Sequence, residues 1–514
     1  MAAMRQKHLN QALMRIPRRA ESTDRYSLAS TYVAAGSFSA MLHSTDHQIL
    51  YGRRGTGKTH ALQFLSDLVD RTGDVPIYLD LRTIGSAGGM YGDSSVDTNV
   101  RGTQLLVDTL EAVHEELLTL ASERDIGDET KLLEALDTLA EAATVVEVVG
   151  QVEQETRVGG TRSHEQGLEL SRAPKISLGS RQAVSAESRT RRTGVERHHI
   201  VFGPLSRALR GITRALGRRR LWLLLDEWSS IPLDLQPLLA DLLRRSVLPA
   251  QGITVKIAAI ERRSKFCEPG AAGDYVGIEV GADAASAVSL DDVMIFDHTQ
   301  AGAREFFAEL FFNHGMARMP ASAGKPEDAE SFVELLFRGN AFNELVRAAE
   351  GVPRDAINIA ALAAQHAHNE PIGIADIRRA ARDWYLRDKQ TAISENSAAR
   401  RMLRLLVDEV VGRRRSRTFV VDQMSCLRHE TIDELYDARL LHVLRRGIVD
   451  SKTPGALYDG FAIDYGCYVS LLIDGEVSSR PRDKGGWLAS PKSMPPDGFS
   501  LSREALDLTK LGPP

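Results

Sequence analysis

Apolar and polar positions along the first 300 residues follow two different periods. Short apolar runs bounded by polar or glycine-rich stretches are typical of buried strands, and they lie at 48–51, 75–82, 221–225 and 252–260. Between these runs, apolar residues recur every three or four positions, which predicts amphipathic helices at 58–70 and 101–120. A fifth strand is expected near 275–281. Strands that alternate with helices predict a parallel sheet with helices on both faces.

From residue 298 onward the helical period predominates. Residues 298–392 hold four helical stretches and predict a small all-α domain. Residues 393–475 differ, because helical stretches at 398–411 and 430–440 precede two strand-like runs, 441–450 and 458–473. Helices followed by a hairpin are typical of a winged helix-turn-helix. The expected fold class is therefore α/β, with a parallel P-loop NTPase sheet, an α-helical lid and a C-terminal winged-helix domain.

Three segments lack a core-forming pattern. Residues 1–23 are basic and polar and predict a loose N-terminal arm in front of the sheet domain at 24–297. Residues 125–200 interrupt that domain and are rich in Ser, Arg, Gly and Glu, which predicts a disordered surface insertion. An arginine-rich loop that touches a nucleic acid or a neighbouring subunit is the alternative there. The tail, 476–514, is rich in Pro, Gly and Ser and predicts disorder.

The turn after the first strand carries the most specific chemical signal. It matches G-x-x-x-x-G-K-[ST] from Gly52 to Thr59 and lies between an apolar strand and an amphipathic helix. Glycines let successive backbone N–H groups point at phosphate oxygens, Lys58 reaches the outer phosphates, and the Thr59 hydroxyl ligates Mg²⁺. The residues expected to bind the nucleotide are Gly52, Arg53, Arg54, Gly55, Thr56, Gly57, Lys58, Thr59 and His60.

A second acidic signal follows the third strand. The apolar run 221–225 ends in Asp226 and Glu227. Asp226 at the carboxyl end of a central strand is expected to hold Mg²⁺ through water, and Glu227 suits a general base that polarises the attacking water. Together with Lys58, this pair indicates ATP hydrolysis to ADP and phosphate. We find no N-K-x-D-type base reader, which argues against a GTPase.

Composition limits the remaining function classes. The chain has 514 residues and a formal net charge of −5, so we expect no global attraction to nucleic acid or membrane. No apolar run approaches the length that spans a bilayer, and the first residues show no signal-type apolar segment. The three cysteines are scattered without metal-ligand spacing. We therefore expect a cytoplasmic protein that uses ATP and Mg²⁺ and has no membrane partner.

The lid carries a motif with a family resemblance. Gly351, Pro353 and Arg354 open a helix in a way that resembles the second sensor of AAA+ ATPases. The order of phosphate loop, Asp-Glu strand, G-x-P-R lid and winged helix resembles the origin-recognition and cell-division-control initiator branch of that family, over about residues 25–475. The resemblance implies that Arg354 is a catalytic residue that touches the γ-phosphate and reports ATP or ADP to the lid.

The sequence departs from that family in the loop after the fourth strand. The family's polar first sensor is often Asn, whereas here Ile260 is followed by Glu261, Arg262 and Arg263. An ionised Glu261 cannot donate a hydrogen bond to phosphate, which favours slow turnover. The family's arginine finger has no clear match, and Arg262 and Arg263 are the candidates.

The predicted winged helix gives an ambiguous signal about its partner. The helix expected to enter a DNA groove carries Glu430, Asp433, Glu434 and Asp437, each of the wrong sign for phosphate. A DNA backbone could instead meet the basic cluster, which consists of Arg413, Arg414, Arg415 and Arg417. A protein partner or a second copy of the chain is the alternative.

Three function classes follow from these observations. The leading hypothesis is an AAA+ switch that binds and hydrolyses ATP and assembles on DNA or a protein partner, as an initiator, a loader or a defence protein. The second is a signalling NTPase of the STAND type with a protein-docking winged helix. A small-molecule kinase is the third, and the long C-terminal part and Glu227 beside Asp226 argue against it.

Overall fold

The structure is a computed structural model of the whole chain. The part of the chain that it describes comprises residues 2–20, 23–33, 38–84, 90–143, 146–153, 191–198, 202–270, 273–283, 286–293, 300–320, 325–426, 430–449, 455–478, 486–487, 505–506 and 508.

The centre of the fold is a five-stranded sheet in which every neighbouring pair is parallel. Its order is β2-β5-β6-β1-β9, from Val75–Asp80 through Leu221–Asp226, Ile253–Ala259 and Gln48–Tyr51 to Ser286–Ser289. The predicted parallel sheet is confirmed, but the expected fifth strand near 275–281 is wrong. Residues Tyr275–Gly277 form β8, which pairs with β7 (Cys267–Pro269) in a separate hairpin. The fifth strand of the sheet is β9, which is short and half serine, so it gives little apolar signal.

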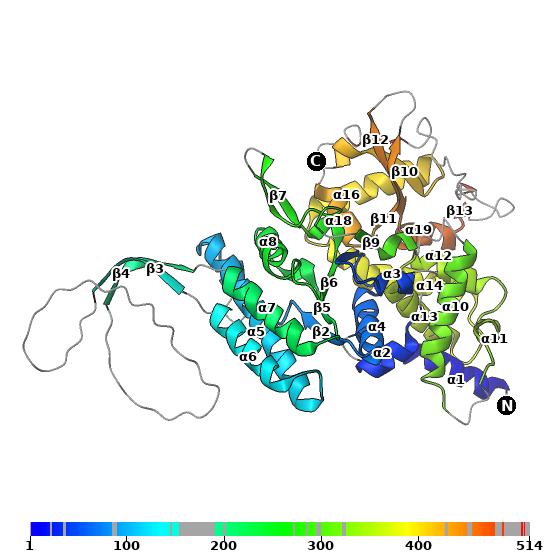
Figure 1. The fold of residues 1–514 in the computed structure, drawn as a ribbon. Helices are drawn as coiled ribbons and strands as arrows, with labels where there is room; N and C mark the ends of the chain where they lie inside the picture. Colours follow the sequence, from blue (N-terminus) through cyan, green and yellow to red (C-terminus); the bar gives the residue numbers. More distant parts are fainter. Residues whose placement is uncertain are drawn as a thin grey trace, which may run out of the picture.

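Helices cover both faces of the sheet (Figure 1). On one face, β-strand side chains pack with α5 (Thr98–Glu123), α6 (Glu129–Ala143), α7 (Phe202–Leu216) and α8 (Gln236–Ser246). On the other face they pack with α3 (Phe38–Leu42) and α4 (Lys58–Arg71), and α2 (Arg25–Thr31) lies beside α4. The helix expected at 58–70 is thus confirmed within one residue.

The insertion predicted at 125–200 is partly ordered. Helix α6 buries Leu132, Leu136 and Leu139 against α5 and α7, so the expectation of disorder is wrong for its first twenty residues. The i, i+4, i+7 spacing of these leucines indicates a helix, but the polar composition of the whole insertion led to the expectation of disorder. Strands β3 (Val146–Glu153) and β4 (Arg191–His198) pair antiparallel and project from the body in Figure 1. The remainder of the insertion, at 144–145, 154–190 and 199–200, lies outside the described residues.

The lid consists of α10 (Gln300–Met316), α11 (Ala329–Leu336), α12 (Ala341–Ala349), α13 (Pro353–Ala367) and α14 (Ile374–Trp384), followed by a π-helical turn (Tyr385–Lys389) and α15 (Gln390–Ala392). The N-terminal residues are not a loose arm. They form α1 (Ala2–Met14), whose Leu9 and Leu13 are buried against the lid, and the Asn10 amide donates to the His368 carbonyl at 2.7 Å.

The C-terminal module runs through α16 (Ser397–Leu406), a π-helical segment (Val407–Arg413), β10 (Thr418–Asp422), α17 (Gln423–Cys426), α18 (Glu430–Asp437), β11 (Leu441–Val449), β12 (Leu457–Ile463) and α19 (Tyr465–Ile473). Strands β10, β12 and β11 form an antiparallel sheet. The helices and the hairpin lie in the expected order, and the winged-helix assignment stays a prediction. The strand-like run 458–473 is wrong beyond Ile463, since Asp464 caps α19.

Two further short strands, β13 (Val477–Ser478) and β14 (Gly486–Trp487), pair in parallel. The predicted disordered tail is wrong near its end. The Leu506 N–H donates to the Val420 carbonyl at 2.8 Å, and the Leu506 and Leu508 side chains are buried. Two isolated leucines among polar residues give no periodicity from which such docking could be predicted.

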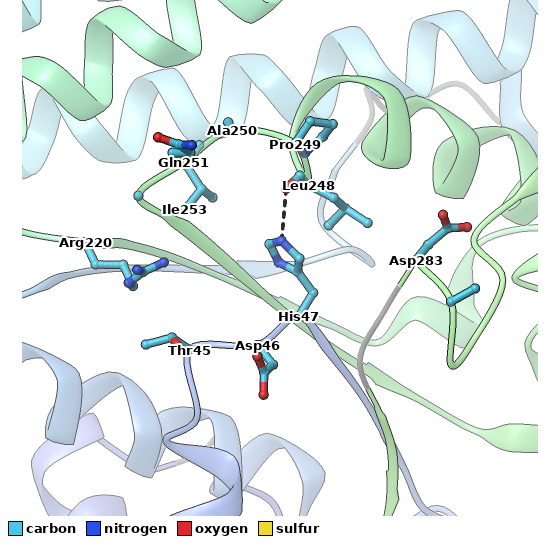
Figure 2. A pocket seen from close by; sticks show the side chains of 12 residues that line it. Thr45, Asp46, His47, Arg220, Leu248, Pro249, Ala250, Gln251, Ile253 and Asp283 are labelled. Carbon is cyan, nitrogen blue, oxygen red and sulfur yellow. Dashed lines mark hydrogen bonds between the residues drawn. The ribbon is translucent and has the colours of Figure 1, made fainter.

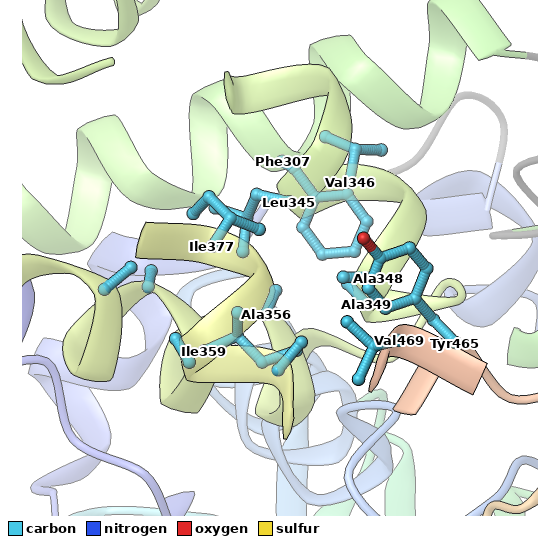
Figure 3. Close-up of a cluster of buried hydrophobic side chains, with 14 of the residues drawn as sticks. Phe307, Leu345, Val346, Ala348, Ala349, Ala356, Ile359, Ile377, Tyr465 and Val469 are labelled. Carbon is cyan, nitrogen blue, oxygen red and sulfur yellow. The ribbon is translucent and has the colours of Figure 1, made fainter. Parts of the chain in front are cut away.

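The apolar cores divide the chain into two bodies. The sheet and its helices, residues 25–293, hold two cores of their own, and we call this part the sheet body. One continuous core joins α1, the lid, the C-terminal module, Leu506 and Leu508, which together we call the C-terminal body. Figure 3 shows this shared core, in which Tyr465 and Val469 of α19 lie against Phe307, Leu345 and Ala356 of the lid.

Candidate nucleotide site

The glycine-rich turn leaves the carboxyl end of β1 and enters α4 at Lys58. Gly55 and Gly57 have φ angles of 86° and 96°, a region that other residues rarely adopt. The Lys58 ammonium is buried and donates to the carbonyls of Gly52 at 2.8 Å and Arg53 at 3.1 Å. The Thr56 hydroxyl also donates to the Arg53 carbonyl, at 2.9 Å. The loop therefore encloses its own lysine.

Asp226 and Glu227 lie at the carboxyl end of β5, on the same edge of the sheet. Asp226 is 1% exposed, and it accepts hydrogen bonds from the Tyr78 hydroxyl and the Glu227 N–H, both at 2.8 Å. Glu227 has a φ of 57°, and such left-handed strain in a non-glycine residue concentrates at functional sites. Its carboxylate lies 4.0 Å from the Arg82 guanidinium. Asp226 is thus fixed, whereas Glu227 turns out of the strand.

The charges at this edge influence one another. Burial lowers the pKa of Lys58, while the carboxylates of Asp226 and Glu227 oppose that shift. Burial, followed by the neighbouring Asp226 carboxylate, raises the pKa of Glu227 above its usual range. A buried cation beside two carboxylates, one of them with a raised pKa, fits a triphosphate, a divalent cation and a general base.

The lid reaches the turn through Arg354 at the start of α13. The Arg354 N–H donates to the Gly55 carbonyl at 3.1 Å. A Cβ added at Gly55 would lie 2.7 Å from the Arg354 Cβ and 3.2 Å from its Cδ. Glycine is therefore required at position 55 by both its φ angle and this close approach. The Arg354 guanidinium is also close enough to Lys58 for its positive charge to lower the pKa of Lys58.

Three other residues of the predicted nucleotide set are His60, Arg54 and Thr59. The His60 ring lies against Tyr32 and His314, and its Nε2 lies 2.6 Å from the Leu28 carbonyl, so the ring faces α2 and α10. Arg54 is exposed. Thr59 is half-buried on the first turn of α4. The roles predicted for these three residues stay predictions.

Arg53 turns its side chain away from the loop and into the C-terminal body. Its N–H and Nε both donate to Asp291, at 2.9 and 2.7 Å. Its Nη1 contacts Nδ1 of His442 in β11, and its Nη2 donates to the Glu350 carbonyl at 3.4 Å. With the side chain 5% exposed, this guanidinium is used for contacts within the protein and does not face the nucleotide site.

A buried polar network continues from His442. Its Nε2 lies 2.9 Å from Asp464, and Asp464 accepts from Lys389 at 2.5 Å. Lys389 also pairs with Asp355 at 2.9 Å, and Asp355 is adjacent in sequence to Arg354. Sequence reasoning missed every member of this network beyond Arg53. Its residues are far apart in the chain and share no period or motif.

The segment after β6, Glu261 to Arg263, docks on the C-terminal module. Arg262 pairs with Asp433 and Arg263 with Asp437, both on α18. Glu261 receives two hydrogen bonds from Arg446 of β11. Two of the four acidic residues that made α18 a poor DNA-reading helix, Asp433 and Asp437, therefore pair with arginines of the sheet body.

The predicted basic cluster is divided by burial. Arg417 is 5% exposed and pairs with Glu350, so its placement in an exposed patch is wrong. Arg414 donates to Glu409 and to the Ala505 carbonyl, and Arg415 donates to the Glu476 carbonyl. The Arg413 side chain is 81% exposed and pairs with Glu409 at 3.1 Å.

The opposite edge of the sheet holds a cavity of about 620 Å³ (Figure 2). It is lined by residues at the amino ends of the strands, including His47 before β1, Arg220 before β5 and Asp283 before β9. The His47 Nε2 lies 3.0 Å from the Leu248 carbonyl, and its Nδ1 accepts from the Val255 N–H at 3.1 Å. Both ring nitrogens of His47 therefore contact backbone groups at or just before β6. Ligands of open parallel sheets bind at the carboxyl ends of the strands, so this cavity is not the nucleotide site.

The parallel sheet and the glycine-rich turn at the end of β1 fit a P-loop α/β fold. No family model and no curated protein matches the chain. Among solved structures it is similar to the ORC1 protein of Aeropyrum pernix in complex with DNA, with 13% identity, 88% of this chain and 96% of that chain covered, and a TM-score of 0.30. At that TM-score the likeness decides nothing, and function rests on the residues above. None of the described helices is both long and apolar enough to cross a bilayer.

Proposed function

We propose that the protein is an AAA+ type switch that binds ATP with Mg²⁺ and hydrolyses it slowly to ADP and phosphate. The observation that supports this is the convergence of four groups at one sheet edge. Lys58 comes from the glycine-rich turn, Asp226 and Glu227 from the end of β5, and Arg354 from the lid. Each group has a distinct role in phosphoryl transfer.

The roles follow from charge and position. A phosphate replaces the carbonyls of Gly52 and Arg53 as the partner of the Lys58 ammonium, because the ammonium binds an anionic oxygen more strongly than a neutral carbonyl oxygen. Bound Mg²⁺ neutralises charge on the phosphate oxygens, and Thr59 and Asp226 are the residues that would hold it. Glu227 accepts the proton of the attacking water. Arg354, already against Gly55, offers a second cation to the outer phosphates.

Nucleotide titration tests the assignment. Lys58→Ala removes the buried ammonium and should weaken ATP binding by at least ~100-fold, the equivalent of about 3 kcal/mol of charge-assisted contacts. Lys131→Ala is the matched control, since Lys131 is an exposed lysine on α6 whose side chain is 68% exposed. Equal ATP affinity of Lys58→Ala and the Lys131→Ala control would overturn the proposed nucleotide site.

A signalling NTPase of the STAND type is the second candidate, and one observation favours it. Helix α18, which a DNA-binding winged helix would place in a groove, is held by Arg262 and Arg263. In this arrangement a protein partner suits the module better than a DNA groove does. Pull-down with and without ATP, compared with duplex binding at low salt, separates these two classes of partner.

A further inference from the structure

Helices α6 and α7 lie side by side at the outside of the sheet body (Figure 1). Their apolar side chains point inward, to the core that they share with α5 and α8. Residues three and four positions apart lie on the same face of a helix, and on both helices the face opposite the core is charged. The basic stripe on α7 consists of Arg207, Arg210 and Arg214, and the acidic stripe on α6 consists of Glu134, Asp137 and Glu141, all of them exposed.

The basic stripe has no carboxylate partner in the part of the chain that the structure describes. None of its three arginines forms an ion pair there, and the Arg210 Nε donates to the Ser206 carbonyl of the same helix at 3.1 Å. The two stripes do not neutralise each other either, because both point away from the shared core. Like charges at this spacing repel one another on a helix, so an opposite charge placed over the arginines would relieve that repulsion.

The packing of the two helices sets the stripes side by side. The Asp128 N–H, at the start of α6, donates to the Ala215 carbonyl near the end of α7 at 2.9 Å, so the helices run antiparallel. Further along, Gly211 lies against Ala135, and a Cβ added at Gly211 would be 2.9 Å from the Ala135 Cβ. Each stripe is centred close to this contact, so the two lie at the same height along the helix pair.

We infer from this arrangement that the outer face of α6 and α7 binds a second copy of the chain in a two-fold symmetric dimer. A two-fold axis that runs parallel to the helices, midway between them, places the acidic stripe of each copy over the basic stripe of the other. The same attraction is then made twice. An axis that crosses the helices at right angles within the interface would place like charges together. The inference does not depend on the proposed nucleotide site.

A nucleic acid fits this face less well than a second copy does. Phosphates attracted by the arginines would come close to the acidic stripe on the adjacent helix, which repels them. An acidic protein surface would meet the same repulsion. A partner with both signs side by side satisfies both helices, and the chain itself carries such a surface.

Sedimentation of the full-length chain without nucleotide tests the dimer. We expect a dissociation constant on the order of 10 μM at low salt, as suits a small polar interface. The dimer should weaken as the ionic strength rises, because the contacts are between exposed charges. A wild type that stays monomeric at ~100 μM, or a dimer that salt does not affect, would overturn the inference.

Two charge-reversal variants test which surface is used. The all-acidic variant carries Arg207→Glu, Arg210→Glu and Arg214→Glu. The all-basic variant carries Glu134→Arg, Asp137→Arg and Glu141→Arg. Each variant alone should self-associate at least ~100-fold more weakly than the wild type, because every attraction across the two-fold interface becomes a repulsion and occurs twice. An equimolar mixture should form a heterodimer about as stable as the wild-type dimer, because each copy then offers the charge that the other lacks.

Helix α16 provides a matched control for the change of net charge. A control variant reverses three exposed arginines there, through Arg400→Glu, Arg401→Glu and Arg404→Glu. It should stay within ~2-fold of wild-type self-association, since its substitutions lie outside the proposed interface. An equal loss in the control and in the all-acidic variant would overturn the inference, because the effect would then come from net charge alone.

The mixture gives the decisive result. Two folded variants that remain monomeric when mixed would contradict the two-fold arrangement, and so would a monomeric wild type that binds duplex DNA through the basic stripe. If a triple variant does not fold, the single exchanges Arg210→Glu and Asp137→Arg replace the two variants. Each should then weaken self-association by about 5-fold, with the same recovery on mixing.

Discussion

Lys389 is the cation on which the buried network of the C-terminal body depends. Its side chain is 2% exposed and lies between Asp355 and Asp464, whose side chains are 0% and 1% exposed. Lys389→Met keeps the length of the side chain and removes the charge. Breaking a buried pair by removing one partner costs about 3–5 kcal/mol, because the remaining charge is left uncompensated. Arg439 still pairs with Asp355, which limits the loss to this range.

Calorimetry measures this loss as a shift of the melting temperature. For domains of 150–250 residues, 1 kcal/mol corresponds to about 2–4 °C, so we expect the transition of the C-terminal body to fall by roughly 6–20 °C at pH 7. Lys131→Met is the control, since the exposed Lys131–Asp128 pair is worth at most about 1 kcal/mol. A fall of under 3 °C in the melting temperature of Lys389→Met would refute the expected loss of about 3–5 kcal/mol.

The pH dependence gives an independent check. Burial tends to raise the pKa of Asp355, but Lys389 and Arg439 outweigh it and hold the pKa below its usual range. A lowered pKa contributes stability that is present above the unfolded pKa and is lost as the pH falls through the folded pKa. Without Lys389 that pKa rises, so the folded variant takes up a proton earlier. The difference between wild type and variant should therefore shrink from pH 7 to pH 4, and a constant difference contradicts this reasoning.

Three further predictions concern the site and its partners. Glu227→Gln should bind ATP normally and hydrolyse it at least ~100-fold more slowly. Wild-type turnover should rise with pH through a value above the usual Glu range, because the base must be ionised. Unchanged single-turnover rates in Glu227→Gln would mean that another residue is the base. Arg354→Ala should weaken ATP binding more than ADP binding, since it loses a contact to the outer phosphates, and equal losses in calorimetric titration would leave Arg354 a structural contact of Gly55. Any duplex DNA binding should weaken steeply with salt, and Arg413→Ala with Arg415→Ala should flatten the dependence of log affinity on log salt by about two phosphate contacts. Arg417→Ala should instead destabilise the module. Absence of binding at low salt would exclude DNA as the partner.

The sequence predicted the sheet, and it predicted that the candidate site residues meet at the carboxyl ends of the strands, because these signals are local. Lys58 and Asp226 each follow an apolar strand within a few residues, and parallel strands bring their carboxyl ends to one edge whatever lies between them. The loop and strand motifs can therefore be recognised in the sequence without any knowledge of tertiary contacts. The edge strand β9 failed this test, since its four residues carry little apolar signal.

The contacts between the two bodies could not be predicted in the same way. Arg53 and His442 are 389 residues apart, and neither belongs to a periodic pattern that would place it inside the protein. Arg53 was expected to serve the nucleotide because it lies in the loop motif, but its side chain points into the other body. In the sequence, the acidic residues of α18 argue against DNA binding and indicate no other role. The structure shows that Asp433 and Asp437 form ion pairs with Arg262 and Arg263.

Helix α1 has a consequence for the order in which the molecule is built. Its Asn10 amide binds a carbonyl 358 residues further along the chain, and its leucines complete the lid core. At synthesis rates of about 5–20 residues per second, roughly 20–70 s pass before that partner emerges from the ribosome. During this interval the apolar side of the first helix has no core to enter. The sheet body can complete its own cores meanwhile, so the nascent chain carries a folded sheet and an exposed helix that is open to chaperones or to a lid on another copy.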